Sequence, residues 1–187
     1  MKFKISTMTY VCKLVDIVDT KQFYDNNVEK YIDEEFYVEN KLTKFNKKRK
    51  LVKSFGNQIT LKSVIKNYNI KIFTNGNVQI TGIKHHNDML SIEKKFLQIF
   101  NSNVKDIRMV MMNVTFKISD SKIHLYKLFD ALINLDRTVL YTPEIYPGLK
   151  FKYNKSTALI FATGSIILST SCEDDIAIMQ TIITEVL

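Results

Sequence analysis

Apolar and polar residues alternate along two long stretches of the chain. KFKISTMTYVCKL at 2–14 and KDIRMVMMNVTFKI at 105–118 follow the two-residue period of a strand with one buried face. After each stretch, apolar residues recur every three or four positions, which predicts helices over 20–36 and 121–135. The side chains expected to point inward from these helices are Phe23, Val28, Tyr31, Ile32, Ile123, Tyr126, Phe129, Leu132 and Ile133.

A second duplicated pattern closes each half of the chain. The pair Phe73 and Gly76 recurs 88 residues later as Phe161 and Gly164, each time between two strand-like segments. A helical period follows each pair, and the acidic residues that precede it suit a helix N-terminus better than a catalytic site. The inward positions of these two helices are Met89, Ile92, Phe96 and Ile99, then Ile176, Met179, Ile183 and Val186.

The order strand, helix, several strands, helix therefore occurs twice. This order predicts an α+β fold in which a mainly antiparallel sheet carries helices on one face and leaves the other face open to a partner. We expect two repeats, 1–103 and 104–187, that pack as one domain, with a basic insertion at about 37–54 in the first repeat.

The net charge of +8 arises in the first half of the chain. Residues 1–103 contain 18 Lys and Arg against 10 Asp and Glu, whereas residues 104–187 contain 9 of each kind. Seven of the basic residues fall in KLTKFNKKRKLVK at 41–53, which has no acidic residue. Such a run is typical of a solvated loop, of a nuclear import signal or of a loop that contacts phosphates, and the sequence leaves all three open.

Several classes of protein are not indicated. No apolar run approaches the ~18 residues of a membrane-spanning helix and the N-terminus lacks the apolar block of a signal peptide, so we expect an intracellular protein with no membrane partner. Cys12 and Cys172 are far apart, which predicts two reduced, partly buried thiols. The adjacent His85 and His86 favour a solvated turn over a metal site. Without a phosphate-binding loop, a zinc-protease motif or a nucleophile elbow, we expect neither an enzyme nor a cofactor.

The stretch YTPEIYPGLKFKYNKSTALIFATGSIILST at 141–170 resembles the second repeat of the TATA-box-binding protein family. The family pattern there is Tyr-x-Pro-Glu-x-Phe-Pro-Gly-Leu, a basic strand, and then Leu-Ile-Phe-x-Ser-Gly-x-x-x-Leu-Thr-Gly. Outside this stretch the resemblance lies in the order of the elements. The abundance of Lys, Asn and Ile suggests an AT-rich genome, such as that of a protist or a large DNA virus.

The resemblance implies a fold and a function. The fold would be a saddle of two pseudo-symmetric repeats, a curved antiparallel sheet with helices on its convex face. Members lay the concave face on the minor groove and wedge aromatic side chains between base steps, a mode for which this family is itself the type example. The chain would then be a transcription initiation factor that binds and bends AT-rich promoter DNA. It would recruit a transcription factor B-like protein and RNA polymerase, in the nucleus or at the site of viral transcription.

Carried over residue by residue, the resemblance assigns four groups of residues. The DNA wedges fall on Phe55, Phe73, Tyr146 and Phe161. The minor-groove face comprises Thr7, Thr9, Lys71, Gln79, Thr81, Met109, Met111, Leu159, Ile167 and Ser169. Phosphate contacts fall on Lys53, Lys62, Lys66 and Lys152, and the factor-binding stirrup falls on Pro143, Glu144 and Ile145.

Five of these positions depart from the family pattern. Thr7 and Met109 stand where the family has asparagines. Lys71 and Gln79 replace apolar groove-facing residues, and Tyr146 carries a hydroxyl at the tip of a wedge. These changes predict DNA binding with a reduced preference for TATA over other AT-rich sequences. The alternative is a protein-interaction scaffold that keeps the fold but has weak or lost sequence-specific DNA binding.

Overall fold

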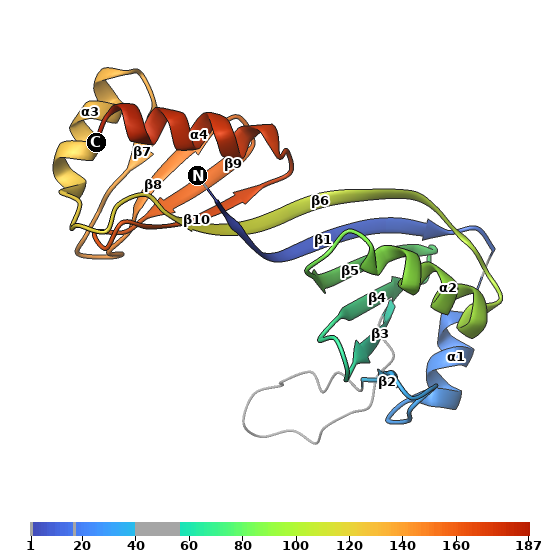
Figure 1. Cartoon of the computed structure of the whole chain (residues 1–187). Helices are drawn as coiled ribbons and strands as arrows, with labels where there is room; N and C mark the ends of the chain where they lie inside the picture. Colours follow the sequence, from blue (N-terminus) through green and yellow to red (C-terminus); the bar gives the residue numbers. More distant parts are fainter. Residues whose placement is uncertain (1, 17, 40–56) are drawn as a thin grey trace. The chain divides into compact units, whose positions relative to one another are not determined.

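The computed structural model describes residues 2–16, 18–39 and 57–187, in which four helices accompany ten strands (Figure 1). The helices are α1 (Thr20–Asn27), α2 (Asp88–Phe100), α3 (Leu125–Asn134) and α4 (Asp174–Glu185). The strands are β1 (Lys4–Leu14), β2 (Phe36–Val38), β3 (Gln58–Ser63), β4 (Asn69–Phe73), β5 (Asn77–Ile83), β6 (Val104–Lys117), β7 (Thr138–Leu140), β8 (Leu149–Tyr153), β9 (Ser156–Ile160) and β10 (Ser165–Thr170). Their hydrogen-bonded order is β2-β3-β4-β5-β1-β6-β10-β9-β8-β7. The predicted α+β class with an antiparallel sheet is confirmed.

The chain divides into two compact units. The first unit is Met8–Val110, and the second unit combines Met1–Thr7 with Met111–Leu187. The long strands β1 and β6 each contribute one end to either unit. This division in space is not the expected division of the sequence into repeats, whose boundary near Asn103 stays a prediction.

In the first unit, β2, β3, β4, β5 and β1 bury one face of the sheet. The strand residues of this core alternate with more exposed ones, as half-buried strands require. Met89, Ile92 and Phe96 of α2, which the sequence predicted to point inward, are also buried. The buried strand residues include Met8, Tyr10, Cys12, Leu14, Ile59, Leu61, Ile70, Ile72, Val78 and Ile80.

The second unit repeats this arrangement with β6, β10, β9, β8 and β7. Its buried residues include Phe151, Ala158, Ile160, Ile166 and Leu168 on the strands, and Ile176, Met179 and Ile183 on α4 as predicted.

A buried polar cluster fixes the start of α4. The Ser156 hydroxyl donates to a carboxylate oxygen of Asp175 (2.5 Å) and lies 2.7 Å from the Thr170 hydroxyl. The Asn154 amide donates to the other oxygen of Asp175 (3.3 Å). Asp175, one of the acidic residues expected only to favour the helix N-terminus, therefore also holds α4 against the turn between β8 and β9.

The two central hairpins are duplicates in register as well as in sequence. In the first unit Lys71 pairs with Gln79, and in the second unit Leu159 pairs with Ile167, which is the same pair 88 positions later. Each hairpin closes in the same way: the Gly76 N–H donates to the Phe73 carbonyl and the Gly164 N–H donates to the Phe161 carbonyl, both at 2.9 Å. The duplication predicted from Phe73 and Phe161 thus extends to the hydrogen bonds of the turns.

The first helix is shorter than the apolar pattern predicted. The prediction covered 20–36, but α1 ends at Asn27. The Asp33 carboxylate accepts the backbone N–H groups of Glu35 (2.8 Å) and Phe36 (2.7 Å). These hydrogen bonds turn the chain into β2. Tyr31, expected inside, is 63% exposed. Hydrogen bonds between an aspartate side chain and the backbone compete with the backbone hydrogen bonds of a helix. The spacing of apolar residues does not reveal them.

The third helix begins later than predicted and presents a different face. α3 starts at Leu125 rather than near 121, because the Ser119 hydroxyl accepts the Ser121 N–H (3.1 Å) in a turn before it. Leu125, Leu128 and Leu132 form its buried face, whereas Tyr126 and Ile133, expected inside, are 62% and 45% exposed.

The cysteines, the histidine pair and the helices were each the subject of a prediction. Both cysteines are free, Cys12 buried and Cys172 exposed. His85 and His86 lie in an exposed turn, where His86 is hydrogen-bonded to the Tyr10 hydroxyl. No group of three metal-ligating side chains occurs among the described residues. None of the described helices is both long and apolar enough to cross a membrane.

Candidate functional site

In each unit, the strand residues that alternate with those of the core form a second face, which we call the open face. Two residues of this face in the first unit, Thr9 and Thr60, are buried, each at 4% exposure. On the first unit the open face carries Thr9, Val11, Thr60, Lys62, Asn69, Lys71, Gln79 and Thr81. On the second unit it carries Asn113, Thr115, Lys150, Lys152, Thr157, Leu159, Ile167 and Ser169. Seven of the ten residues assigned to the groove lie among these, and so do Lys62 and Lys152.

Strand register orders the open faces into matching rows. One row reads Val11, Gln79, Lys71, Thr60 in the first unit and Thr115, Ile167, Leu159, Lys150 in the second. The neighbouring row reads Thr9, Thr81, Asn69, Lys62 in the first unit and Asn113, Ser169, Thr157, Lys152 in the second. Lys62 and Lys152, both assigned to phosphates, thus end equivalent rows and are exposed.

The rows also identify a residue that sequence reasoning missed. Thr9 pairs with Thr81 and Asn113 pairs with Ser169, so Asn113 is the counterpart of Thr9. The Ser169 hydroxyl donates to the side-chain oxygen of Asn113 (2.6 Å). By this register the counterpart of Thr7 is Met111 rather than Met109. The constant offset of 104 residues between β1 and β6 was the signal in the sequence that would have found Asn113.

Two predicted wedges of the second unit lie together. The rings of Tyr146 and Phe161 meet edge to face, with centroids 6.1 Å apart and an interplanar angle of 64°. Gly148 makes this contact possible, because a Cβ there would lie 2.8 Å from the Tyr146 ring and 3.1 Å from the Phe161 ring. Tyr146 remains 41% exposed, so the pair is available to a partner.

The predicted stirrup is an exposed turn beside this ring pair. The Thr142 carbonyl accepts the N–H groups of Ile145 (2.9 Å) and Tyr146 (3.0 Å). The turn exposes Glu144, and Ile145 is 84% exposed.

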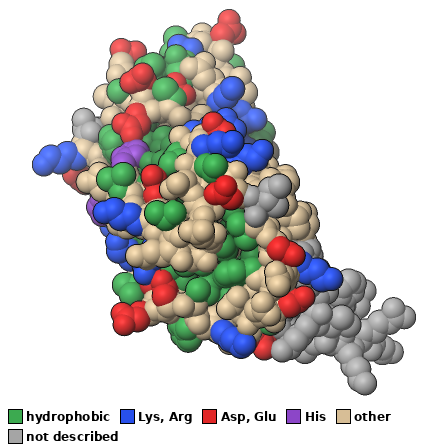
Figure 2. Space-filling view, turned by 90° about the vertical axis from the view of Figure 1, so that its right-hand side faces the viewer, with side chains coloured by type: hydrophobic (Ala, Val, Ile, Leu, Met, Phe, Trp, Pro, Cys, Tyr) green, Lys and Arg blue, Asp and Glu red, His purple; other side chains and the backbone are tan. Residues whose placement is uncertain are grey.

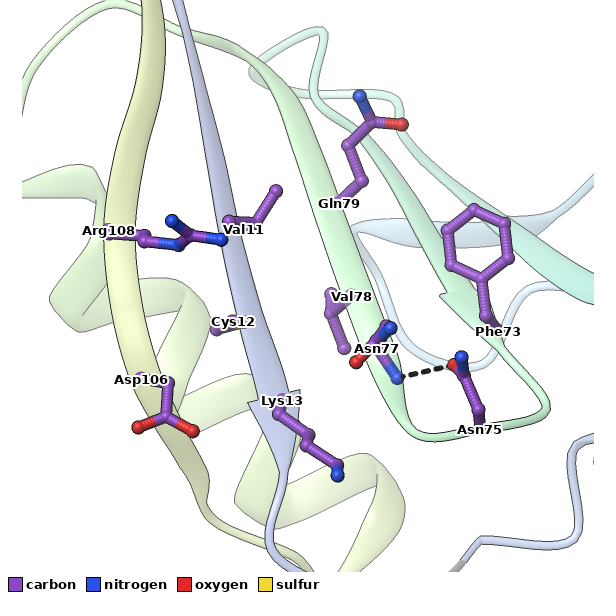
Figure 3. Close-up of a pocket in the computed structure, with 10 residues that line it drawn as sticks. All are labelled: Val11, Cys12, Lys13, Phe73, Asn75, Asn77, Val78, Gln79, Asp106 and Arg108. Atoms are coloured by element: carbon purple, nitrogen blue, oxygen red, sulfur yellow. Dashed lines mark hydrogen bonds between the residues drawn. The ribbon is translucent and has the colours of Figure 1, made fainter. Parts of the chain in front are cut away.

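The predicted wedge of the first unit stands at the edge of a hollow of about 600 Å³ (Figure 3). Phe73 is half-buried, and the hollow also takes in Gln79 on β5 and Arg108 on β6. Asn75 and Asn77 lie in the turn beside Phe73, where the Asn77 N–H donates to the Asn75 side chain (3.0 Å). The assigned partner Phe55, the phosphate contact Lys53 and the basic stretch 41–53 lie outside the described residues.

Lys66 differs from the other assigned lysines because it already has a partner. Its ammonium group lies 3.3 Å from the Asp88 carboxylate at the start of α2 and 5.9 Å from the centre of the Tyr68 ring. A phosphate contact by Lys66 stays a prediction that would require this ion pair to open.

Charges of both signs are mixed on the face of the molecule that Figure 2 shows. Figure 2 shows Lys and Arg side chains interspersed with Asp and Glu, with hydrophobic side chains between them. Seven of the 18 basic residues in 1–103 lie at 41–53, which leaves 11 basic against 10 acidic residues in the described part of that half.

Comparisons with known proteins agree with the fold and the motif. Residues 106–187 match the family described as transcription factor TFIID (or TATA-binding protein, TBP). A TATA-box-binding protein-like protein of Acanthamoeba polyphaga mimivirus is 28% identical over 221 aligned residues, which cover 89% of this chain and 59% of the viral protein. The chain thus spans less than two thirds of that relative. The solved structure of Methanococcus jannaschii TBP has a TM-score of 0.71 at 20% identity, covering 100% of this chain and 98% of the archaeal one.

The family match covers the second repeat, the viral relative covers most of the chain, and the archaeal fold covers all of it. Residues 106–187 are thus similar to the TATA-box-binding protein family, and the whole chain shares the fold of an archaeal TBP.

Proposed function

We propose that the chain is a transcription initiation factor that binds AT-rich double-stranded DNA through the minor groove, bends it, and recruits a transcription factor B-like protein and RNA polymerase. The observation that carries this proposal is the paired Tyr146 and Phe161 rings at the end of an open face of small and branched side chains.

The ring pair supplies the wedge that bending requires. Unstacking a base step costs a few kcal/mol, and an apolar ring that fills the gap offsets that cost. Phe161 presents such a ring, and Gly148 leaves room for Tyr146 against it. The edge-to-face contact limits the freedom of both rings before DNA arrives, so less entropy is lost on insertion.

The open face of the second unit suits the groove floor. Thr157, Leu159, Ile167 and Ser169 form a two-by-two block on β9 and β10. These side chains are short or branched, so base edges can approach the sheet, and A·T pairs present no exocyclic amine that such a surface would leave unpaired. Lys152, at the end of its row, is exposed for a flanking phosphate.

A protein-interaction scaffold is the second candidate function. It is favoured by the turn 142–146, which presents Ile145 at 84% exposure beside the Glu144 carboxylate. An apolar side chain this exposed at the tip of a turn suits a protein partner. Both functions can coexist, because Ile145 and the open face are different surfaces.

The test is DNA bending, measured by energy transfer between dyes at the two ends of a short AT-rich duplex. We expect the wild type to bend the duplex and Phe161→Ala to lose most of the bending, because no ring then offsets the unstacking. Tyr126→Ala is the matched control, since Tyr126 is an exposed aromatic on α3 whose described ring contact is Tyr141. No binding by the wild type, or full bending by Phe161→Ala, would refute the proposal.

A further inference from the structure

The two open faces differ most where they are structurally equivalent. Lys71 and Gln79 form a cross-strand pair on β4 and β5, and Leu159 and Ile167 form the same pair on β9 and β10. Lys71 and Leu159 each stand two residues before the hairpin phenylalanine of their unit, and Gln79 and Ile167 each stand six residues after it. Equal register with opposite chemistry indicates that the faces contact different groups.

The first-unit pair has unused hydrogen-bonding capacity. Neither Lys71 nor Gln79 makes a hydrogen bond or ion pair with another side chain among the described residues, and both are half-buried. Gln79 borders the hollow beside Phe73, with Asn77 and Arg108 on the same hollow (Figure 3). A glutamine amide both donates and accepts, whereas a lysine ammonium only donates.

The second-unit pair has no hydrogen-bonding side-chain atom at all. Ile167 is 39% exposed and Leu159 is half-buried, so both can contact a ligand. Their cross-strand neighbour on β6 is Thr115, whose short side chain adds little polarity.

The minor groove distinguishes these two surfaces. Every base pair presents acceptors there, but only guanine adds a donor, its 2-amino group. Against Leu159 and Ile167 that donor would be buried without a partner, which is costly. The Gln79 carbonyl oxygen can accept it, and Lys71 can donate to the acceptors of any base pair.

We propose that Lys71 and Gln79 form a guanine-tolerant subsite, so that the first unit accepts G·C pairs in its half of the DNA site while the second unit requires A·T. This inference rests on the proposed function and adds the rule by which each half is read. It also predicts a fixed binding direction, because a duplex with one G·C-rich half would place that half under the first unit.

The first experiment needs only the wild-type protein and three duplexes. One duplex has A·T in both halves, one has G·C pairs in one half, and one has G·C pairs in both. We expect the half-substituted duplex to bind about twofold more weakly, through loss of one of two equivalent orientations. The fully substituted duplex should bind about tenfold more weakly or worse, as for mismatched sites in general.

The orientation of the protein on the half-substituted duplex can be measured with a dye attached to one of its own cysteines. Cys172 in the second unit is exposed, whereas Cys12 is buried and burial raises the pKa of its thiol to about 12, with Glu93 contributing. A maleimide dye at neutral pH should therefore label Cys172 selectively. Energy transfer from this dye to the A·T end of the half-substituted duplex should exceed transfer to the G·C end.

Reciprocal variants test the residues themselves. Lys71→Leu with Gln79→Ile should make the half-substituted duplex bind about tenfold more weakly than the A·T duplex. Leu159→Lys with Ile167→Gln should instead relieve the penalty of the fully substituted duplex. Lys21→Leu on α1 removes one positive charge away from the open faces and should change neither ratio.

The outcomes separate this inference from the proposed function. No binding to any duplex would refute the proposed function. Binding to the A·T duplex with equal, additive penalties for each G·C half would refute the guanine-tolerant subsite and leave the proposed function standing. If circular dichroism shows that a double variant is unfolded, two wild-type measurements still test the guanine-tolerant subsite. These are the affinities for the three duplexes and the energy transfer from the dye on Cys172 to each DNA end.

Discussion

Gly148 leaves room for the contact between the Tyr146 and Phe161 rings. The sequence pointed to each of these two residues but not to their contact. Tyr146 and Phe161 were found from the family motif, and the motif also contains the glycine. Their ring contact depends on the missing Cβ at Gly148, which no count of residue types reports. In the first unit the wedge role of Phe73 was assigned from its spacing to Gly76, Phe55 has no such duplicate, and both roles stay predictions. Single positions could be assigned where a motif or an offset repeats, whereas the ring contact between Tyr146 and Phe161 could not.

The two hairpin glycines should differ in their tolerance of alanine. Gly164→Ala should destabilise the protein strongly, because φ is 78° and the new Cβ would lie 2.2 Å from the Ser119 carbonyl oxygen. Gly76→Ala, at φ 80° but with its nearest neighbour 3.9 Å away, should cost only about 1–2 kcal/mol of backbone strain. Urea unfolding of both variants measures the difference, and equal losses would contradict it.

Strand elements were predicted more accurately than helices, for a physical reason. The strand alternation and the offset of 88 residues reproduce the register of both hairpins, since a one-residue error would move apolar side chains to the wrong face. The start of α4 depends on the buried Ser156 and Asp175 contact, and the end of α1 depends on the turn made by Asp33. Both are local polar bonds, which apolar periodicity does not record.

The turn that ends α1 should make the first unit sensitive to acid. Burial alone would raise the pKa of Asp33, but hydrogen bonds from Lys95 (2.7 Å) and the backbone lower it below its ordinary value. A lowered folded-state pKa gives stability that is present above the unfolded pKa of about 4 and is lost as pH falls through the folded value. Asp33→Asn keeps the acceptor for the backbone but loses the charge. It should therefore lower stability at neutral pH and flatten the fall between about pH 5 and 3.

Urea unfolding across that pH range provides the measurement. Asp25→Asn, an exposed carboxylate on α1, is the control and should leave the profile of the wild type unchanged. A profile that Asp33→Asn does not flatten would show that Asp33 contributes nothing to acid sensitivity.

The whole chain carries its excess positive charge in one segment. The described part of the first half is nearly neutral, so the net charge of +8 resides almost entirely at 41–53, outside the described residues. Long-range attraction to DNA should therefore depend on that segment more than on the open faces.

Neutralising Lys47, Lys48, Arg49 and Lys50 to glutamine tests this attraction. Affinity for DNA should fall with salt at a log-log slope of about 0.9 per phosphate neutralised, and the variant should flatten that slope. Binding to TATA and to a shuffled AT-rich duplex should weaken equally, because phosphate contacts carry no base information. Titrations at three salt concentrations measure both effects, and an unchanged slope would mean that 41–53 does not contact DNA.

The division of β1 between the units has a consequence for how the protein is made. The first unit is one continuous segment, and all of its residues have been synthesised once Val110 is added. Residues Met1–Thr7 are made before the first unit, yet they belong to a unit whose remaining residues, Met111–Leu187, are made after it. Until then the start of β1 is a strand edge without its final neighbours, and such edges invite pairing with other chains. Newly made chains should therefore depend on chaperones until Met111–Leu187 has been made, and a fragment that begins at Met111 would lack the Met1–Thr7 part of its own unit.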